Sequence, residues 1–280
     1  MIHSHTRCME LAIFIDQFVY DQWVASYGDK ILAEIKLRSW TRDIVNITQL
    51  LWTGPTMKPK MHFHINFIEI WKKQPKAVYT TDNVTKLVEL FLKHVRPEAK
   101  KLGGWDRAVL ISGYDLPHLV GHYSRNVSVQ CKAMDAGFLL LHKGQGSYEM
   151  AGYLAHLIGH TVGMGHYRDP NCSESKYIMA NKNGLEWSSC SKSAFQLWLR
   201  NNSCLNSSIC EDRIQKYPGI FTAPHEAQVY RHMGYCYRWD YKAKEKLVKS
   251  CDILLYTFHG DTQNSTFYNR LDGTFCGKNK

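Results

Sequence analysis

Three histidines lie within one eleven-residue segment of this chain, at positions 156, 160 and 166. Residues four apart lie only about 40° apart around an α-helix, so His156 and His160 would present both imidazoles to one point. Gly163 can adopt the positive φ that ends a helix and turns the chain sharply, which would bring His166 round as a third ligand. Three such ligands, with a fourth position left for water, are typical of catalytic zinc. The segment therefore predicts a helix, a turn and a zinc site rather than three unrelated surface histidines.

Hydrophobic periodicity predicts alternating strands and helices in the first half of the chain. Short apolar or alternating runs indicate strands, whereas apolar residues three to four apart indicate helices. One helix is expected to begin at an Asp82 N-cap and to stop near Pro97 and Gly103-Gly104. We expect strands at 11–15, 61–71, 108–112 and 138–141, and further helices at 29–54, 148–162 and 193–199. This order favours a mostly parallel sheet with crossover helices.

Cysteines and glycosylation acceptors indicate an extracellular protein. Eight of the nine cysteines lie between Cys131 and Cys276, as in a disulfide-stabilised secreted chain. The apolar run at 11–15 is too short to span a membrane, and no segment has the order of a signal peptide. We therefore expect a secreted protein whose export signal and pro-segment are absent from this sequence; a cytosolic protein with free thiols is the alternative. Seven Asn-x-Ser/Thr acceptors occur, at Asn46, Asn83, Asn126, Asn171, Asn201, Asn206 and Asn264.

The chain is basic, with a formal net charge of +10. Its lysines and arginines are scattered, apart from small groups such as the four lysines within 242–249. No helix-turn-helix, zinc-finger or RNA-binding motif accompanies the charge, so specific nucleic-acid binding is not expected. A solvated surface is one interpretation, and binding to extracellular polyanions is the functional alternative.

The three histidines resemble the His-Glu-x-x-His-x-x-Gly-x-x-His motif of the metzincins, and Met179 stands where that family has its methionine turn. Within the metzincins the chain is most similar to the reprolysin (adamalysin) group and to ADAMTS-like proteins. The resemblance implies an α/β (α+β) fold with a mixed, mostly parallel twisted sheet, an antiparallel edge strand, an active-site helix and a Met-turn. It is carried further by segments 10–16, 68–71 and 106–113, which resemble that family's strands, and by 187–191 and Cys204.

The resemblance also implies two domains. Residues 1–209 would form a reprolysin-like zinc metalloprotease domain. Residues 210–280 look like an incomplete, loop-rich disintegrin-like module that contains cysteines and ends just after an Asp-Gly-Thr-x-Cys-Gly sequence. The module has no Arg-Gly-Asp, so integrin binding has no direct support.

Disulfides and a second metal site follow from the resemblance as well. Its implied calcium site is incomplete in this sequence, because the remaining family ligand is out of register near Asn206. Cys8 has no obvious partner. The implied pairs are Cys131–Cys204 and Cys172–Cys190, and the implied ligands of a structural Ca²⁺ are Glu10, Asp106 and the Cys204 carbonyl.

Two positions depart from the family pattern. Leu157 replaces the glutamate that takes a proton from the attacking water and delivers it to the leaving amine. Glu149 lies seven residues upstream of His156, about 10 Å along the helix axis, and cannot substitute. Asp169 and Glu174, in the loop after the third histidine, could act only through a relaying water. Tyr167 follows the third histidine, where reprolysins usually carry aspartate.

Three functions are compatible with this sequence. The first is a zinc-binding pseudoprotease that binds extracellular protein or matrix targets. The second is a working zinc metalloendopeptidase that cleaves such proteins. The third is an adhesion-modulating module without metal. The intact set of three histidines argues against the third, and Leu157 argues against the second, because a general base typically contributes about two to four decades in rate.

Overall fold

The computed structural model describes most of the first 205 residues and a smaller part of the rest. The chain divides into two compact units, the first comprising 1–143 and 149–213 and the second comprising 144–148 and 214–280. None of the described helices has the length and apolar character needed to cross a membrane. The described residues are 7–54, 57–99, 104–116, 121–123, 137–142, 144–180, 184–202, 205, 235–236, 252–259 and 262–269.

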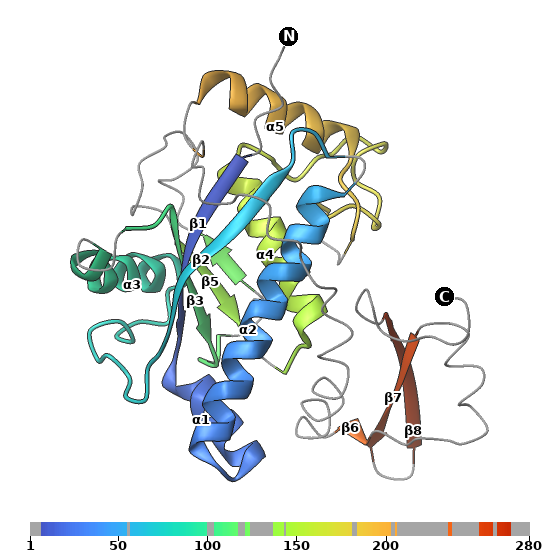
Figure 1. Ribbon diagram of the computed structural model, residues 1–280. Coiled ribbons are helices and arrows are strands. Elements are labelled where there is room, and N and C mark those ends of the chain that lie inside the picture. The colour runs from blue at the N-terminus through green and yellow to red at the C-terminus, as the bar shows by residue number, and fades with distance from the viewer. Residues whose placement is uncertain are drawn as a thin grey trace. The chain divides into compact units, whose positions relative to one another are not determined.

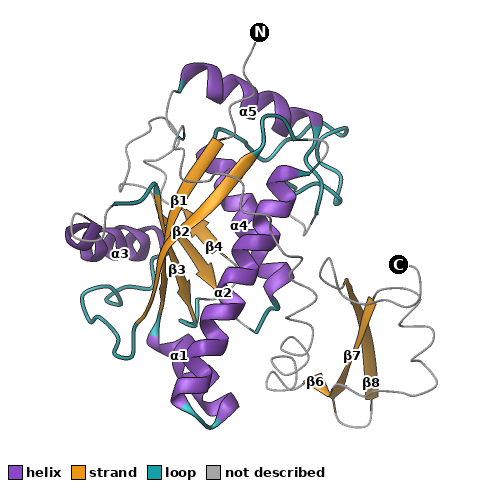
Figure 2. Ribbon diagram, in the orientation of Figure 1, coloured by secondary structure: helices purple, strands orange, loops and turns teal. Residues whose placement is uncertain are grey.

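A five-stranded sheet with the order β2-β1-β3-β5-β4 forms the centre of the first unit (Figure 2). The first four strands in this order are parallel, and the edge strand β4 runs antiparallel to β5. This confirms the predicted mixed sheet with an antiparallel edge. The strands β1, β3 and β5 are almost wholly buried, as expected for parallel strands covered on both faces. Their bounds are β1 Arg7–Ile15, β2 Met61–Ile70, β3 Arg107–Ser112, β4 Gly121–Tyr123 and β5 Gly137–Leu141.

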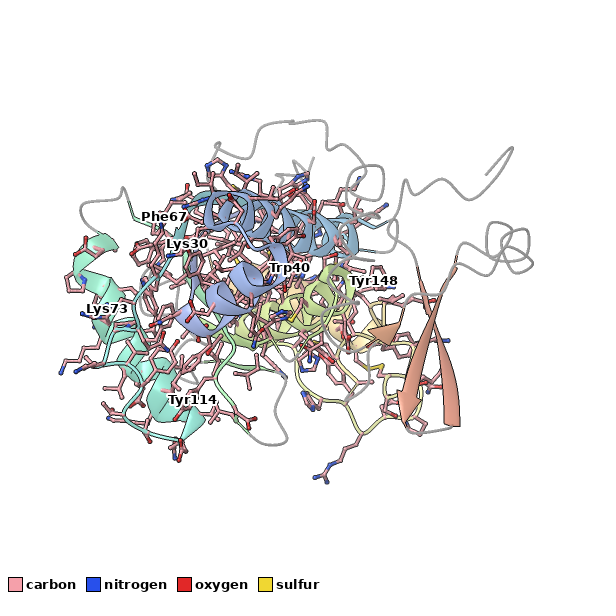
Figure 3. All side chains as sticks on the ribbon, turned by 90° about the horizontal axis from the view of Figure 1, so that it is seen from below. Lys30, Trp40, Phe67, Lys73, Tyr114 and Tyr148 are labelled. Atoms are coloured by element: carbon pink, nitrogen blue, oxygen red, sulfur yellow. A yellow bond between two sulfur atoms is a disulfide. The ribbon has the colours of Figure 1, made fainter. Side chains whose placement is uncertain are left out.

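Helices cover both faces of this sheet (Figure 1). The apolar side of α3 packs against alternate residues of β1, β3 and β5, including Phe14, Leu110 and Leu139. On the other side α2 and α4 lie next to each other, joined by a hydrogen bond from the Thr48 hydroxyl to the Ala151 carbonyl. Side chains fill the space between the layers (Figure 3). The helices are α1 Gln17–Tyr27, α2 Lys30–Thr53, α3 Val84–Ala99, α4 Ser147–Thr161 and α5 Ser189–Asn201.

The predicted N-cap of α3 was wrong by one residue, whereas the helix ends at Ala99, close to the predicted stop near Pro97. Asn83, not Asp82, caps the helix, because its side-chain oxygen accepts the backbone N–H of Lys86 at 3.0 Å. The Asp82 carboxylate instead accepts a hydrogen bond from the Tyr114 hydroxyl. Pro97 lies inside the helix, which continues to Ala99. Proline has no backbone N–H to donate, but so close to the end of the helix this loss affects only the last turn.

The second unit contains a three-stranded antiparallel sheet with the order β6-β7-β8. Its strands are β6 Tyr235–Cys236, β7 Asp252–His259 and β8 Thr262–Asn269. The rest of the expected disintegrin-like module, including Cys276, and the expected boundary at 209/210 lie outside the described residues. The disintegrin-like assignment therefore stays a prediction.

Candidate metal centre

The predicted zinc ligands converge at the end of α4. His156 and His160 lie on one side of its last turns, and the chain then turns at Gly163, which has the positive φ of 85° expected from the sequence. The Nε2 atoms of the three histidines lie within 3.0 to 3.1 Å of one another. Ligand nitrogens at the corners of a zinc tetrahedron are about 3.3 Å apart, given Zn–N distances of about 2.0 Å. The three imidazoles therefore aim at a common point of nearly the right size.

Hydrogen bonds fix which ring nitrogen of two histidines carries the proton. The Nδ1 atom of His156 lies 2.7 Å from the Ile178 carbonyl, and that of His160 lies 3.0 Å from the Met164 carbonyl. A carbonyl only accepts, so each Nδ1 must be the donor, and each Nε2 presents a lone pair. Two lone pairs facing each other at 3.0 Å repel unless a cation lies between them. The donor set therefore fits a metal ion, and zinc is the ion that such a set prefers.

Burial favours the neutral, metal-binding form of these two rings. Burial is the main cause that lowers the pKa of His156, and it lowers the pKa of His160 to about 4. The neighbouring histidines contribute to the lowering of both values, whereas the hydrogen bonds to Ile178 and Met164 oppose it. Ligation requires deprotonated histidine, so the protein environment already selects the correct state.

The predicted methionine turn lies beneath the histidines. Met179 is fully buried, and the segment before it is held by a hydrogen bond from the Ile178 N–H to the Glu186 carbonyl. A Cβ on Gly159 would lie only 2.6 Å from the Met179 sulfur, so a larger residue here would require the buried Met179 side chain to move. The turn thus supports the site twice, through the Met179 side chain and through the Ile178 carbonyl.

The position of the expected general base is occupied by an apolar, buried side chain. Leu157 follows His156 on α4 and is 5% exposed. Among the described residues, the group of potential ligands that includes the three histidines contains no aspartate or glutamate. Within the described part of the chain, the structure therefore brings the three histidines together in a group that includes no carboxylate.

Each carboxylate considered as a substitute is engaged elsewhere. The Glu149 carboxylate accepts a hydrogen bond from the Tyr153 hydroxyl at 2.8 Å. Glu174 forms an ion pair with Lys176, 2.9 Å long. Asp169 accepts a backbone N–H from its own loop and lies beside a disulfide instead of the histidines. None of these three carboxylates belongs to the group of potential ligands formed by the histidines.

Comparison with known proteins decides the family. The sequence model of the Reprolysin (M12B) family zinc metalloproteases matches residues 7–208. The chain belongs to the reprolysin family. It is also 24% identical over 307 aligned positions to "A disintegrin and metalloproteinase with thrombospondin motifs adt-1" of Caenorhabditis elegans. That alignment covers 97% of this chain but only 20% of the relative, so this reprolysin chain spans about a fifth of the length of that relative.

Two solved structures are similar only at a low level. Metalloproteinase-II from Bacteroides fragilis superposes with a TM-score of 0.45 and 12% identity, covering 69% of this chain and 54% of that one. A chain from a "chaperone-substrate complex" gives 0.48 and 14%, covering 71% and 40%. Similarity at this level carries no argument about activity.

One of the two predicted reprolysin disulfides lies within the described residues. Cys172 and Cys190 are bonded, across a separation of 18 residues, as the family resemblance implied. The predicted pair Cys131–Cys204 lies outside the described residues. Cys8, for which the sequence offered no partner, is itself disulfide-bonded.

Two of the three predicted calcium ligands lie together at the start of the sheet. The Glu10 N–H donates to the Asp106 carboxylate at 2.9 Å, and the Asn66 amide lies 3.5 Å from the Glu10 carboxylate. Burial is the main cause that raises the pKa of Asp106. The third ligand, the Cys204 carbonyl, lies outside the described residues, but the neighbouring Leu205 carbonyl accepts the N–H of Cys8 on β1. A calcium site here stays a prediction.

Sequence reasoning missed the residues that orient the ligands. The Ile178 and Met164 carbonyls carry no side-chain signal, because any residue supplies the same backbone oxygen. Gly159 did carry a signal in the sequence. A glycine inside a helix costs about 1 kcal/mol, so its presence between two metal ligands indicates close packing at that position.

Proposed function

We propose that this reprolysin domain binds zinc through His156, His160 and His166 but is impaired as a peptidase. The observation that carries the proposal is Leu157, a buried apolar side chain at the position next to His156 where proton transfer takes place in the family. Zinc bound there would polarise a substrate carbonyl as a Lewis acid. What this chain lacks is a side chain that could transfer the proton.

Peptide hydrolysis depends on those proton steps more than many reactions do. An amine is a poor leaving group until it is protonated, and leucine can neither accept a proton from water nor return one to nitrogen. The carboxylates of Glu149, Asp169 and Glu174 are engaged elsewhere, and this argues against a substitute base. A positioned general base and acid is worth about 10² to 10⁴ in rate.

The alternative is an active zinc metalloendopeptidase, and the intact ligand set is the observation in its favour. All three imidazoles converge, and two of them are fixed by carbonyls. The absence of metal would favour the third candidate, an adhesion-modulating module. We infer a secreted, glycosylated protein that acts on extracellular protein or matrix targets, because the family and the adt-1 relative are metalloproteases and the chain is rich in cysteines and glycosylation acceptors.

Zinc content and peptide cleavage, measured on the same preparations, test the proposal. We expect the wild-type chain to hold zinc and to leave a peptide library intact. Leu157→Glu should gain chelator-sensitive cleavage. Leu157→Gln is the matched control, because glutamine has nearly the shape of glutamate but cannot act as a base, and it should stay inactive.

Two outcomes would contradict the proposal. Chelator-sensitive cleavage by the wild-type chain would establish the active peptidase instead. A wild-type chain that binds no zinc, under conditions in which His166→Ala behaves identically, would favour the module without metal.

A structural calcium at Glu10 and Asp106 is part of the same proposal. Two nearby carboxylates at the start of adjacent strands suit the oxygen ligands that calcium prefers. Calcium should raise the thermal midpoint of the wild-type chain but not that of Asp106→Asn. An equal response of the two proteins would count against the site.

A further inference from the structure

The three histidines bring no negative charge to the metal centre. His156 and His160 each donate an Nδ1 proton to a carbonyl, so that each presents a neutral Nε2 to a metal. Ligation requires His166 in its deprotonated, neutral form as well. Within the described part of the chain, the group of potential ligands formed by these rings includes no carboxylate. A divalent ion held there would therefore keep its double positive charge.

Leu157 lies beside this charge. It belongs to α4, as two of the ligands do, and comes directly after His156 and three residues before His160. Side chains three residues apart are neighbours on a helix, with Cβ atoms about 5 to 6 Å apart. A glutamate at position 157 would thus place a negative charge next to any anion that binds at the centre, whereas leucine places none.

The loop after α4 adds a positive charge on the exposed side of the centre. Arg168 is exposed, and it takes part in none of the ion pairs formed within the described residues. It follows His166 by two residues, so that their Cα atoms are at most about 7 Å apart. The carboxylate of its neighbour Asp169 accepts the N–H of Asn171 at 2.9 Å. The Arg168 guanidinium therefore offers N–H donors to an anion near the third ligand.

We propose that Leu157, by removing the negative charge of the family's glutamate, makes the metal centre a receptor for a carboxylate of a protein partner. The inference rests on the proposed zinc site and names the ligand of that site. Carboxylate oxygens are ordinary ligands of zinc, and Arg168 is the type of side chain that pairs with them. The net charge of +10 favours acidic partners, and extracellular thiols are largely oxidised, which favours a carboxylate over a thiolate.

A leucine that only fills space would behave differently. In that case any polar substitution at position 157 would act through lost packing, and glutamate and glutamine would have the same effect on ligand binding. A role through charge separates the two variants, because their side chains have nearly the same shape and differ by one negative charge. Anion affinity is therefore the deciding measurement.

The experiment measures acetate binding at pH 7 through the absorption spectrum of the cobalt-substituted chain. Acetamide is the matched neutral probe. Wild type, Leu157→Glu, Leu157→Gln and Arg168→Gln are compared at saturating cobalt, so that differences in metal affinity do not enter. Two peptides, added to the wild-type chain, distinguish the sources of the carboxylate. One has a free C-terminus and no acidic side chain, and the other has an amidated C-terminus and one internal aspartate.

We expect acetate, but not acetamide, to change the cobalt spectrum of the wild-type chain. Leu157→Glu should weaken acetate binding about ten- to hundredfold through like-charge repulsion, whereas Leu157→Gln should stay within about threefold of the wild type. Arg168→Gln should weaken it about two- to fivefold, as expected for an exposed charge pair. At least one of the two peptides should bind, and its identity shows which kind of carboxylate the centre takes.

Equal acetate affinities of Leu157→Glu and Leu157→Gln would overturn the inference and leave the zinc site standing. So would a wild-type spectrum that does not respond to acetate, or that responds equally to acetamide. Binding of acetate but of neither peptide would overturn the assignment to a protein partner. A wild-type chain that takes up neither zinc nor cobalt would overturn the zinc site itself.

Discussion

Gly159 lies between two zinc ligands and against Met179, so that its lack of a side chain is a packing requirement. A Cβ there would fall 2.6 Å from the methionine sulfur. We expect Gly159→Ala to lower the free energy of unfolding by about 1 to 3 kcal/mol, since overpacking outweighs the better helix propensity of alanine. Gly152→Ala on the same helix meets nothing within 4 Å and should stabilise the protein by about 0.4 to 1 kcal/mol.

Urea unfolding of the two glycine variants measures this difference. Because both substitutions gain the same helix propensity, the comparison isolates the contact with Met179. Equal effects of the two variants would show that the turn yields to the extra methyl group at no cost.

His142 is a buried histidine outside the metal centre. It packs against the Trp40 ring at 5.0 Å, and among the described residues its Nδ1 has no hydrogen-bond partner. Burial lowers its pKa to about 4. The folded-state pKa is then below the unfolded value of about 6.5, so the unfolded chain binds the extra proton first. Its contribution to stability is complete above about pH 6.5 and is lost as the pH falls toward 4, on the order of 3 kcal/mol in all.

His142→Leu should remove this part of the acid sensitivity. Leucine keeps the apolar contact and brings no buried proton acceptor, so stability near pH 7 should change little. Urea midpoints from pH 7 to pH 4, recorded in chelator for both proteins, give the comparison. Parallel pH profiles would mean that His142 is not the group responsible.

Helices and strands with a strong hydrophobic periodicity could be predicted from the sequence. Elements without such periodicity, and the exact capping residues, could not. The helix of the zinc ligands was expected at 148–162 and occurs at Ser147–Thr161. Helix α1 was missed: it begins at the Asp16 N-cap directly after β1, and its eleven residues show no strong apolar face. At α3 the expected cap, Asp82, instead accepts a hydrogen bond from the tertiary neighbour Tyr114, and the next residue, Asn83, caps the helix.

At the metal centre, some residues could be predicted from the sequence and some contacts could not. The histidines, Gly163 and Met179 could be predicted, because the residue type at each position is what the site requires: an imidazole, a positive φ or a thioether. The approach of α5 to the turn at Gly163 could not, because α5 is brought there by packing and by the disulfide rather than by any local pattern.

The disulfide Cys172–Cys190 is expected to matter for both stability and metal binding. It closes a loop of 18 residues, for which the chain-entropy estimate is about 3 kcal/mol. Replacing both cysteines by alanine should therefore lower the thermal midpoint of the metal-free chain and, in addition, weaken zinc binding. Calorimetry with and without zinc separates the two effects. A variant with unchanged zinc affinity would show that the loop keeps its position without the covalent link.

At the scale of the whole molecule, zinc should act as a folding ligand. A metal that binds only the native chain stabilises it by about 4 kcal/mol at a thousandfold excess over Kd, which corresponds to roughly 10 °C in thermal midpoint. We expect chelator to lower the midpoint of the wild-type chain and added zinc to restore it. His166→Ala should respond much less, and an identical response of both proteins would argue against the three-histidine site.

The unequal exposure of the three ligands has a consequence for the rate of metal exchange. The rings of His156 and His160 are held by carbonyl hydrogen bonds, whereas His166 is exposed and lies in the loop after α4. An incoming ion would meet the pair first and be closed in by the third ring, and departure would follow the reverse order. Zinc release by this chain should therefore begin when the exposed His166 leaves the metal, and its rate should depend on the loop that carries this ligand more than on α4.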